Sequence, residues 1–326
     1  MTPWHVLSLV ELPVERVEAL LDGLPVTVSA PASLSLDAAE AVAAEAELIL
    51  GGWSGAVPVG ERLLRAAPGT AAVIQASVGV DTIDVSAAAA RGVPVANAAG
   101  FNAQSVAEWC VGAAISSLRL FTAADAEVRD GGWPQPELAE RGSRELAGLR
   151  VGIVGFGAVG QVCARLFCAF GCEVAHWSRT RRNTVPWLEL DDLVARSDVL
   201  VVSLPLVPDT RGLLDEELLA RLPRDAVLVN AGRGGIVDED AVVRMLRDGK
   251  LAAAAFDVFA AEPLPMDSPL RSDRRILLHP HAAGTTRQSC DRLLAEIRSA
   301  VDRAVRGEPL ANVVNGVEPV VWRRRG

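Results

Sequence analysis

Short apolar runs alternate with longer amphipathic runs along the whole chain. In the first third, runs typical of buried strands cover 5–10, 26–29, 48–51, 73–76 and 93–96. Between these runs the apolar positions recur at helical spacing, as in 14–21 and 36–46. Because a helical run follows most strands, the pattern predicts parallel sheets in an α/β fold.

A second alternating series begins after a loop rich in glycine and proline at 131–136. Before that loop, residues 102–129 contain no proline and predict one helix that is long enough to bridge two domains. A last helix is expected at about 286–305. Two series in 326 residues predict two domains of ordinary size. The strands expected in the second series are 150–154, 173–177, 199–203, 226–230, 253–258 and 276–278.

Composition narrows the class of protein. Half of the residues are hydrophobic, which excludes a disordered chain. The net charge is -9, whereas nucleic-acid-binding proteins normally carry a basic balance. No apolar run approaches the roughly 20 residues that span a bilayer, and residues 1–10 do not resemble a secretion signal. We therefore expect a soluble cytoplasmic protein that binds neither nucleic acid nor membrane. The five cysteines include no CxxC pair, so no metal site is expected.

A glycine-rich segment, Gly155-Phe156-Gly157-Ala158-Val159-Gly160, lies between an expected strand and an expected helix at 161–170. This is the pattern G-x-G-x-x-G in the setting that a dinucleotide site requires. The first glycine makes the tight turn, the second lets the backbone approach a pyrophosphate, and the third lets helix and strand pack closely. Free N–H groups at the helix start then face the anion. The segment predicts a nicotinamide dinucleotide cofactor.

The end of the next strand selects between NAD and NADP. NAD sites usually place Asp or Glu there to bind the ribose 2′-hydroxyl. This chain reads Ser178-Arg179-Thr180, followed by two further arginines. A carboxylate would repel a 2′-phosphate, whereas serine and arginine bind it through charge-assisted hydrogen bonds. The sequence thus favours NADP(H) and leaves NAD(H) possible. The alternative is that these arginines form a solvated surface loop.

Candidate acid–base residues follow the last three expected strands. His279 and His281 follow the last strand, and there are only four histidines in the chain. Arg233 and Glu262 follow the two strands before it. Histidine is the most usual general acid near neutral pH, and ligands of open parallel sheets bind beyond the carboxyl ends of the strands. Singly, each of these residues is more often structural or solvated; together they predict one catalytic edge.

Several ordered motifs resemble the D-isomer-specific 2-hydroxyacid dehydrogenase family, and they extend over nearly the whole chain. In the first series, 78–84 resembles the family's substrate loop and 102–108 resembles its interdomain helix. An ordered set of this length is far more specific than the glycine motif alone. The motifs of the second series are Leu204-Pro205, Asn230-Ala231-Gly232-Arg233-Gly234, Asp257-Val258-Phe259, Glu262-Pro263-Leu264-Pro265 and His279-Pro280-His281.

The resemblance implies roles for the catalytic residues. Arg233 would hold the carboxylate and the keto oxygen of the substrate. His281 would pass a proton to or from that oxygen, and Glu262 would pair with His281. A carboxylate beside an imidazole favours the imidazolium form. Backbone N–H groups near Val78 and Gly79 would bind the other side of the substrate carboxylate.

The resemblance also implies two Rossmann-like, doubly wound parallel-sheet domains with an active-site cleft between them. The substrate domain would be discontinuous, 1–98 plus 288–326, and the NAD(P)-binding domain would be 99–287. Members are commonly homodimers formed through the cofactor domains, and 131–148 is either a dimer arm or a surface loop. Further cofactor contacts would come from Leu204, Pro205, Thr210, Ala231 and, at the nicotinamide carboxamide, Asp257.

One departure within the motifs points to a branch of the family. Ser178 stands where NAD-using members carry Asp, which resembles the glyoxylate/hydroxypyruvate reductases. The expected protein is therefore an oxidoreductase that transfers a hydride between NADP(H) and a small 2-keto or 2-hydroxy acid, with D specificity. Substrate specificity is expected in the loop 51–55 and around Val78.

Three related classes are the alternatives. Formate dehydrogenases resemble the pattern with Gln in place of Glu262, so they fit less well. Phosphonate dehydrogenases place Lys where Val78 stands, and its absence leaves a phosphonate without a cation. Corepressor-like scaffolds that sense the nucleotide keep the same three side chains, but the chain shows no added interaction tail.

Overall fold

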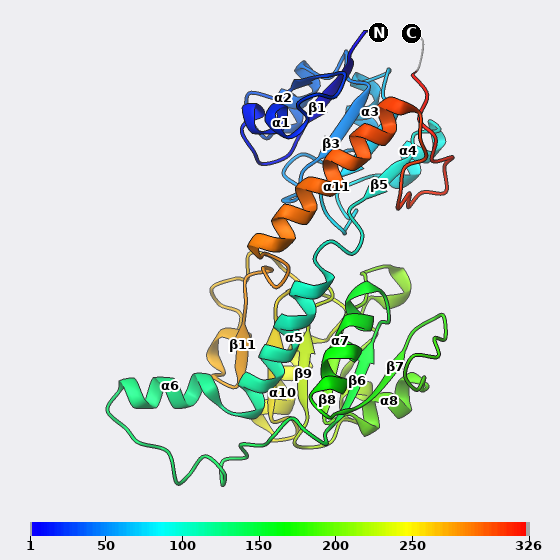
Figure 1. The fold of residues 1–326 in the computed structure, drawn as a ribbon. Coiled ribbons are helices and arrows are strands. Elements are labelled where there is room, and N and C mark those ends of the chain that lie inside the picture. The colour runs from blue at the N-terminus through cyan, green and yellow to red at the C-terminus, as the bar shows by residue number, and fades with distance from the viewer. Residues whose placement is uncertain (1, 324–326) are drawn as a thin grey trace. The chain divides into compact units, whose positions relative to one another are not determined.

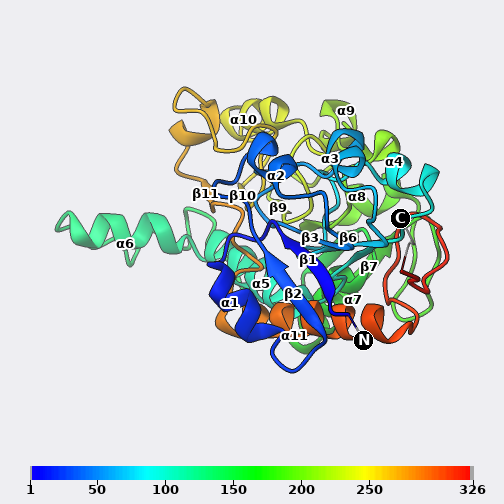
Figure 2. The same ribbon diagram turned by 90° about the horizontal axis from the view of Figure 1, so that it is seen from above.

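The computed structural model describes residues 2–323, and the chain divides into two compact units. Unit 1 combines Met1–Phe101 with Arg287–Gly326, and unit 2 is Asn102–Thr286. Each unit has one parallel sheet, with helices packed on both faces (Figures 1 and 2). The prediction of two doubly wound α/β domains is thus confirmed. Within residues 2–323, no helix combines the length and apolar character needed to cross a membrane.

The sheet of unit 1 has the strand order β2-β1-β3-β4-β5. Two of its interior strands, β3 and β4, are buried along their whole length, as a parallel sheet covered on both faces requires. The strand order reverses between β1 and β3, so the loops after these strands border a crevice at the carboxyl edge. The strands are β1 (Trp4–Ser8), β2 (Val26–Ser29), β3 (Leu48–Gly51), β4 (Ala72–Gln75) and β5 (Val95–Asn97).

Two apolar clusters, one on each face, hold helices against this sheet. The last helix in the sequence, α11, packs on β4 through residues four apart, Leu293, Ile297 and Val301. A helix from the end of the chain therefore completes the core of the N-terminal sheet. The helices of unit 1 are α1 (Val14–Leu20), α2 (Leu36–Ala41), α3 (Glu61–Ala66), α4 (Val85–Ala90) and α11 (Arg287–Arg306).

The sheet of unit 2 has the order β11-β10-β9-β8-β6-β7, and all its pairs are parallel. The order reverses between β6 and β8, which places the ligand crevice of such a sheet beside the end of β6. The strands are β6 (Arg150–Val154), β7 (Glu173–Trp177), β8 (Val199–Val202), β9 (Val227–Asn230), β10 (Ala253–Phe256) and β11 (Ile276–Leu278).

Helices also cover both faces of the second sheet. On one face, α5 (Ala103–Leu118) packs directly on α7 (Ala158–Ala169), with Ala107 and Cys110 of α5 fully buried. The other face is covered by α8, α9 and α10. The remaining elements of unit 2 are α8 (Leu190–Arg196), η1 (Pro208–Thr210), α9 (Glu216–Leu219), α10 (Glu239–Arg247) and η2 (Pro269–Ser272).

The single helix predicted for 102–129 is wrong. The structure has two helices, α5 and α6 (Phe121–Arg129), separated by Leu120 at φ +56°. This left-handed conformation ends a right-handed helix. α5 buries nine residues and packs against α7 and the sheet, whereas α6 buries none and projects from the rest of unit 2 (Figures 1 and 2). No glycine or proline marks the break, so the sequence pattern missed it.

Smaller shifts affect the ends of other elements. The helix expected at 161–170 begins at Ala158, so the third glycine of the motif, Gly160, lies in its first turn. The strand expected at 253–258 ends at Phe256, which leaves Asp257 in the following loop. The helix expected at 36–46 ends at Ala41.

Candidate active site

The glycine segment 155–160 leaves the carboxyl end of β6, at the reversal of strand order in unit 2. Gly155 has φ +100°, and a Cβ there would crowd the backbone of Ser203. A Cβ on Gly160 would overlap the carbonyl of Gly155. Two of the three glycines are therefore required by the fold itself, because they make the turn and the close helix–strand contact.

The remaining glycine, Gly157, has open space where a side chain would begin, with nothing within 4 Å. It caps the start of α7, whose first N–H groups, from Ala158 and Val159, have no backbone partner within the helix. Open space beside a helix N-terminus fits a pyrophosphate, which would lie against the backbone of this loop. The loop therefore passes the test for a dinucleotide.

Phe156 points away from this open side. Its ring is buried and stacks on the ring of His176 in β7, with centroids 3.9 Å apart. His176 is fully buried, its Nδ1 lies 3.2 Å from the carbonyl oxygen of Pro186, and its Nε2 has no hydrogen-bond partner among the described residues. Burial lowers the pKa of His176 below its ordinary value of 6.5. The stack joins the glycine loop to the strand that leads to the ribose position.

Polar contacts hold together the loop after β7, which the sequence predicts to bind the ribose. The Ser178 hydroxyl donates to the carbonyl of Thr180 at 2.7 Å, and the Trp187 indole N–H donates to the carbonyl of Ser178 at 3.0 Å. The Arg181 guanidinium lies 3.8 Å above the Trp187 ring and 3.5 Å from Glu189. Arg179 and Thr180 are exposed. The loop thus uses Arg181 internally and leaves the Arg179 side chain at the surface.

The loop after β8 contains three of the predicted cofactor contacts. Leu204 and Pro205 are the second and third residues after the end of this strand. Thr210, which is buried, accepts the N–H of Val207 at 2.8 Å and donates to the carbonyl of Pro205 at 2.7 Å. Its hydroxyl therefore shapes the loop, and the loop backbone and Leu204 border the glycine turn, where Leu204 Cδ2 would lie 3.0 Å from a Cβ on Gly155.

Arg233 lies in the loop that follows β9. The buried Asn230 holds this loop, because its Oδ1 accepts the N–H of Gly232 at 3.1 Å and its Nδ2 donates to the carbonyl of Arg233 at 3.3 Å. The guanidinium donates to the carbonyl of Gly232 at 2.8 Å. Ala231 joins the loop to β8 through its N–H. A network of local contacts thus fixes the backbone that carries the arginine.

His281 and Glu262 form a hydrogen-bonded pair. Nδ1 of His281 lies 2.7 Å from Oε2 of Glu262, and the other carboxylate oxygen accepts the N–H of Phe259 at 2.9 Å. The His281 side chain is 47% exposed. The two residues come from the loops after β11 and β10, which are neighbouring strands. The structure therefore brings together the imidazole and the carboxylate that the sequence predicted.

Asp257 is the residue that shapes the His281 loop, and its partner His279 was missed as a contact. Oδ1 of the buried Asp257 lies 2.5 Å from Nδ1 of His279 and accepts the N–H groups of Ala282 and Ala283. Its carbonyl accepts the N–H of His281, whose φ is +52°. Such a left-handed backbone needs strong local support. The family resemblance paired Glu262 with His281, but no signal in the sequence pointed to the contact between His279 and Asp257.

His279 and His281 line one pocket of about 540 Å³ at this edge of unit 2. The Arg271 side chain also lines it and donates to the carbonyls of Leu264 and Pro265. The walls are otherwise mostly apolar, which is typical of a small-molecule site with few polar groups. The rest of the lining is Phe259, Glu262, Pro263, Leu264, Leu278 and Pro280.

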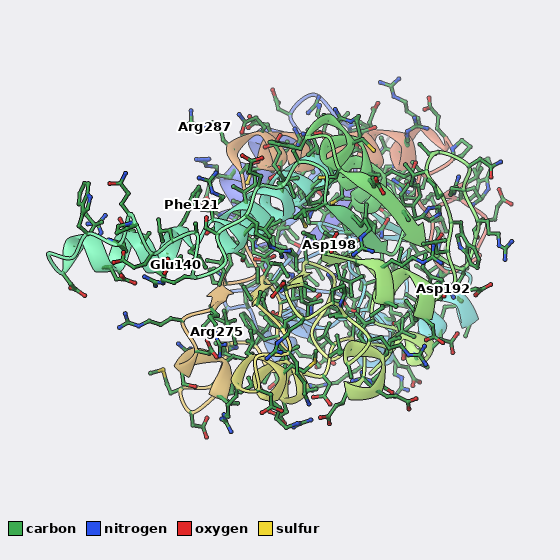
Figure 3. All side chains as sticks on the ribbon, turned by 90° about the horizontal axis from the view of Figure 1, so that it is seen from below. Phe121, Glu140, Asp192, Asp198, Arg275 and Arg287 are labelled. Carbon is green, nitrogen blue, oxygen red and sulfur yellow. The ribbon has the colours of Figure 1, made fainter. Side chains whose placement is uncertain are left out.

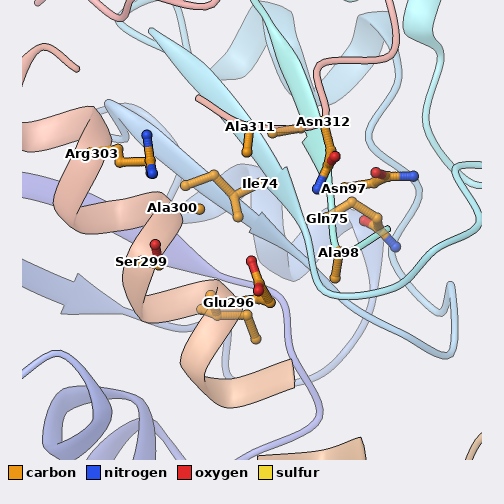
Figure 4. Close-up of a pocket in the computed structure, with 12 residues that line it drawn as sticks. Ile74, Gln75, Asn97, Ala98, Glu296, Ser299, Ala300, Arg303, Ala311 and Asn312 are labelled. Atoms are coloured by element: carbon orange, nitrogen blue, oxygen red, sulfur yellow. The ribbon is translucent and has the colours of Figure 1, made fainter. Parts of the chain in front are cut away.

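The predicted substrate loop lies in unit 1, directly after β4. Its backbone carbonyls are held by side chains, since Asn97 donates to the carbonyl of Val78 at 2.6 Å and Ser77 donates to that of Gly79 at 2.7 Å. The buried Gln75 in turn donates to Ser77. Gln75 and Asn97 lie beside a small hollow at the end of β4 and β5, shown in Figure 4. These contacts fix the backbone that carries the N–H groups of Val78 and Gly79.

Comparison with known proteins decides the family. The profile described as D-isomer specific 2-hydroxyacid dehydrogenase, NAD binding domain, matches residues 111–283. This is more than half of the chain, and it includes the glycine loop, Arg233, Glu262 and His281. The chain belongs to the D-isomer-specific 2-hydroxyacid dehydrogenase family. The predicted family is confirmed, and the matched region of unit 2 is the family's NAD-binding domain.

This chain is also similar to individual members of the dehydrogenase family. A D-3-phosphoglycerate dehydrogenase from Mycobacterium tuberculosis is 37% identical over 266 residues, or 80% of this chain and 50% of that protein. The chain thus spans about half the length of such relatives. A glyoxylate reductase from Aeropyrum pernix is 36% identical over 267 residues, covering 78% of each. A solved glyoxylate reductase from Paecilomyes thermophila matches 96% of this chain and 99% of its own, with a TM-score of 0.85 and 25% identity.

Proposed function

We propose that this chain reduces small 2-keto acids of the glyoxylate or hydroxypyruvate type to D-2-hydroxy acids, with NADP(H) as cofactor. The observation that carries the proposal is the 2.7 Å contact between His281 and Glu262. Both residues lie in loops that follow strands of the sheet from which the glycine loop also leaves. An exposed imidazole backed by a carboxylate is suited to proton transfer at a carbonyl oxygen. The similarity to glyoxylate reductases supports this substrate class.

The dinucleotide would be held mainly by backbone. The N–H groups of Ala158 and Val159 would face the pyrophosphate across Gly157, while Phe156 contributes only its main chain because its ring is buried. Ser178, Arg179 and Thr180 would surround the ribose 2′-phosphate. When bound, the reduced nicotinamide supplies the hydride. Residues that would line its other parts are Gly155, Gly160, Leu204, Pro205, Thr210, Ala231 and Asp257.

The residues of the chain would supply the proton and the orientation. In the direction of reduction, His281 donates a proton to the keto oxygen, and the hydrogen bond to Glu262 fixes the orientation of the imidazole ring. Arg233 pairs with the carboxylate and stabilises negative charge that develops on the oxygen. The N–H groups of Val78 and Gly79 bind the second side of the carboxylate. In the reverse direction, His281 accepts the proton of the hydroxyl group.

A second candidate substrate is D-3-phosphoglycerate. The observation that favours it is the 37% identity to phosphoglycerate dehydrogenases. Its phosphate is a larger anionic group than glyoxylate carries, so the two candidates separate in a substrate panel. A phosphonate substrate and a scaffold role without turnover are the further alternatives, and the same panel tests them.

We also propose that two copies associate through the arm formed by α6 and 131–148. Phe121 and Val128 on α6 are 52% and 48% exposed, and Trp133 after it is 73% exposed. Figure 3 shows Phe121 at the base of this arm and Glu140 on the loop that returns from it. Apolar side chains gathered on a projecting segment favour a protein partner. Light scattering of Phe121→Ser should show monomers where the unaltered chain shows dimers; equal masses would remove the arm from the interface.

A test of the function is a panel assay with purified protein. The panel contains glyoxylate, hydroxypyruvate, pyruvate, D-3-phosphoglycerate and phosphite, each with the appropriate redox form of both cofactors. The proposal expects the highest kcat/KM with NADPH and one of the first two substrates. Turnover only with D-3-phosphoglycerate or phosphite would select the corresponding alternative.

A further inference from the structure

Two loops of unit 2, carrying Arg233 and Glu262, are locked together at one peptide. Gly234 lies so close to the peptide joining Phe259 and Ala260 that a Cβ at this glycine would overlap the carbonyl of Phe259. The Arg233 loop therefore rests directly on the loop that leads to Glu262. A movement of the peptide at 259–260 would displace the backbone that leads to Glu262.

Two glutamates, one before this peptide in the sequence and one after it, accept its neighbouring N–H groups. Glu262 accepts the N–H of Phe259 at 2.9 Å, as described above. Glu239, in the first turn of α10, accepts the N–H of Ala260 at 2.6 Å. Successive N–H groups of one loop thus bind two carboxylates, and one of these is the partner of His281.

Glu239 belongs to α10, the helix that follows the Arg233 loop. Its bond to Ala260 therefore links this part of the chain to the loop that carries Glu262. It is half-buried, and its burial raises the pKa of its carboxyl, with further contributions from the charges of Asp240, Glu262 and Asp238. A protonated carboxyl still accepts the N–H of Ala260 through its carbonyl oxygen. The contact is therefore kept in both protonation states, although the hydrogen bond from Ala260 by itself favours the charged form and lowers the pKa.

We infer that Glu239 is a positioning residue for the catalytic pair, which holds the 259–260 peptide so that Glu262 faces His281. This inference rests on the proposed reductase function. Glu239 touches neither substrate nor cofactor in this role; it acts through Glu262. A misplacement of a catalytic group by about 1 Å can lower turnover by as much as about 10²-fold.

The test compares three substitutions with a matched control in the NADPH-dependent reductase assay. Glu239→Gln keeps the length and the acceptor, so we expect kcat within twofold of the unaltered chain. Glu239→Asp keeps the charge but loses the reach, and Glu239→Ala loses both; for each we expect kcat to fall about tenfold with KM nearly unchanged. Asp240→Ala, which removes a neighbouring acid from the same helix turn, should leave kcat unchanged.

A double-mutant cycle with Glu262→Gln separates positioning from general damage to the fold. If Glu239 acts through Glu262, adding Glu239→Ala to Glu262→Gln lowers kcat by less than twofold further. A full additional tenfold loss would overturn the inference, as would a normal kcat for both Glu239→Ala and Glu239→Asp, or a loss in Glu239→Gln that Glu239→Asp does not share. Failure of the proposed function itself looks different, because the unaltered chain would then turn over no 2-keto acid.

Discussion

Nδ1 of His281 lies 2.7 Å from Oε2 of Glu262, and the backbone of His281 has the left-handed φ of +52°. Asp257 supports this conformation, because its backbone carbonyl accepts the N–H of His281 and its Oδ1 accepts the N–H of Ala282 and lies beside Nδ1 of His279. The carboxylate that contacts the His281 ring is therefore Glu262, whereas the carboxylate that holds the His281 loop belongs to Asp257. This division of labour makes the roles of Glu262 and Asp257 separable by experiment.

Replacing His281 by alanine should lower kcat for 2-keto acid reduction by about 10²-fold or more, because a positioned general acid typically contributes that much. Steady-state kinetics with NADPH measure it. The control is His5→Ala, since His5 lies in β1 of unit 1 and bonds to Thr27 and Ser29. A near-normal rate for His281→Ala would remove this residue from the mechanism.

Alanine at Gly157 should weaken cofactor binding, whereas alanine at Gly160 should lower the stability of the fold. Gly157→Ala meets open space, so the free energy of unfolding should stay unchanged while NADPH binds about tenfold or more weakly. Gly160→Ala overlaps the Gly155 carbonyl and should destabilise the fold by about 1–3 kcal/mol.

Denaturant titration and NADPH fluorescence titration separate these two effects. Unchanged NADPH affinity in Gly157→Ala would mean that the pyrophosphate does not approach this loop. Unchanged stability in Gly160→Ala would contradict the close contact between α7 and the turn.

Arg179→Ala should weaken NADPH by about tenfold, because a charge-assisted hydrogen bond to the 2′-phosphate is lost, while NADH affinity changes little. Dissociation constants for both cofactors measure the difference. Arg196→Ala, an exposed position at the end of α8, is the charge-matched control. Equal weakening of both cofactors would mean that Arg179 does not read the 2′-phosphate.

The buried His176 should make the stability of the protein depend on pH. The unfolded chain takes up a proton at this side chain as the pH falls through about 6.5, whereas burial lowers the pKa of the folded form. In that window the unfolded state binds more protons, so the free energy of unfolding decreases as the pH falls below about 6.5.

Urea unfolding of the unaltered chain and of His176→Phe between about pH 7 and pH 5 isolates this contribution. The variant keeps a ring against Phe156 but has no proton to bind, so its stability should fall less over the same range. Identical slopes for the two proteins would show that His176 does not contribute.

The sequence predicted the sheets because buried parallel strands carry continuous apolar runs; β2, β3, β6, β7 and β11 have the predicted bounds. It predicted the glycine turn and the proximity of Glu262 to His281 because strand ends of one sheet share an edge. The break at Leu120 escaped prediction because it comes from loss of tertiary contacts and not from a local signal. The His279–Asp257 contact escaped because side-chain pairing depends on rotamers and loop backbone.

The most direct measurement is the oxidation of NADPH by purified protein with glyoxylate or hydroxypyruvate, compared with NADH under the same conditions. The account predicts saturable turnover with at least one of the two keto acids and a higher kcat/KM with NADPH than with NADH. Absence of turnover with both keto acids and both cofactors, in protein shown to be folded, would contradict it.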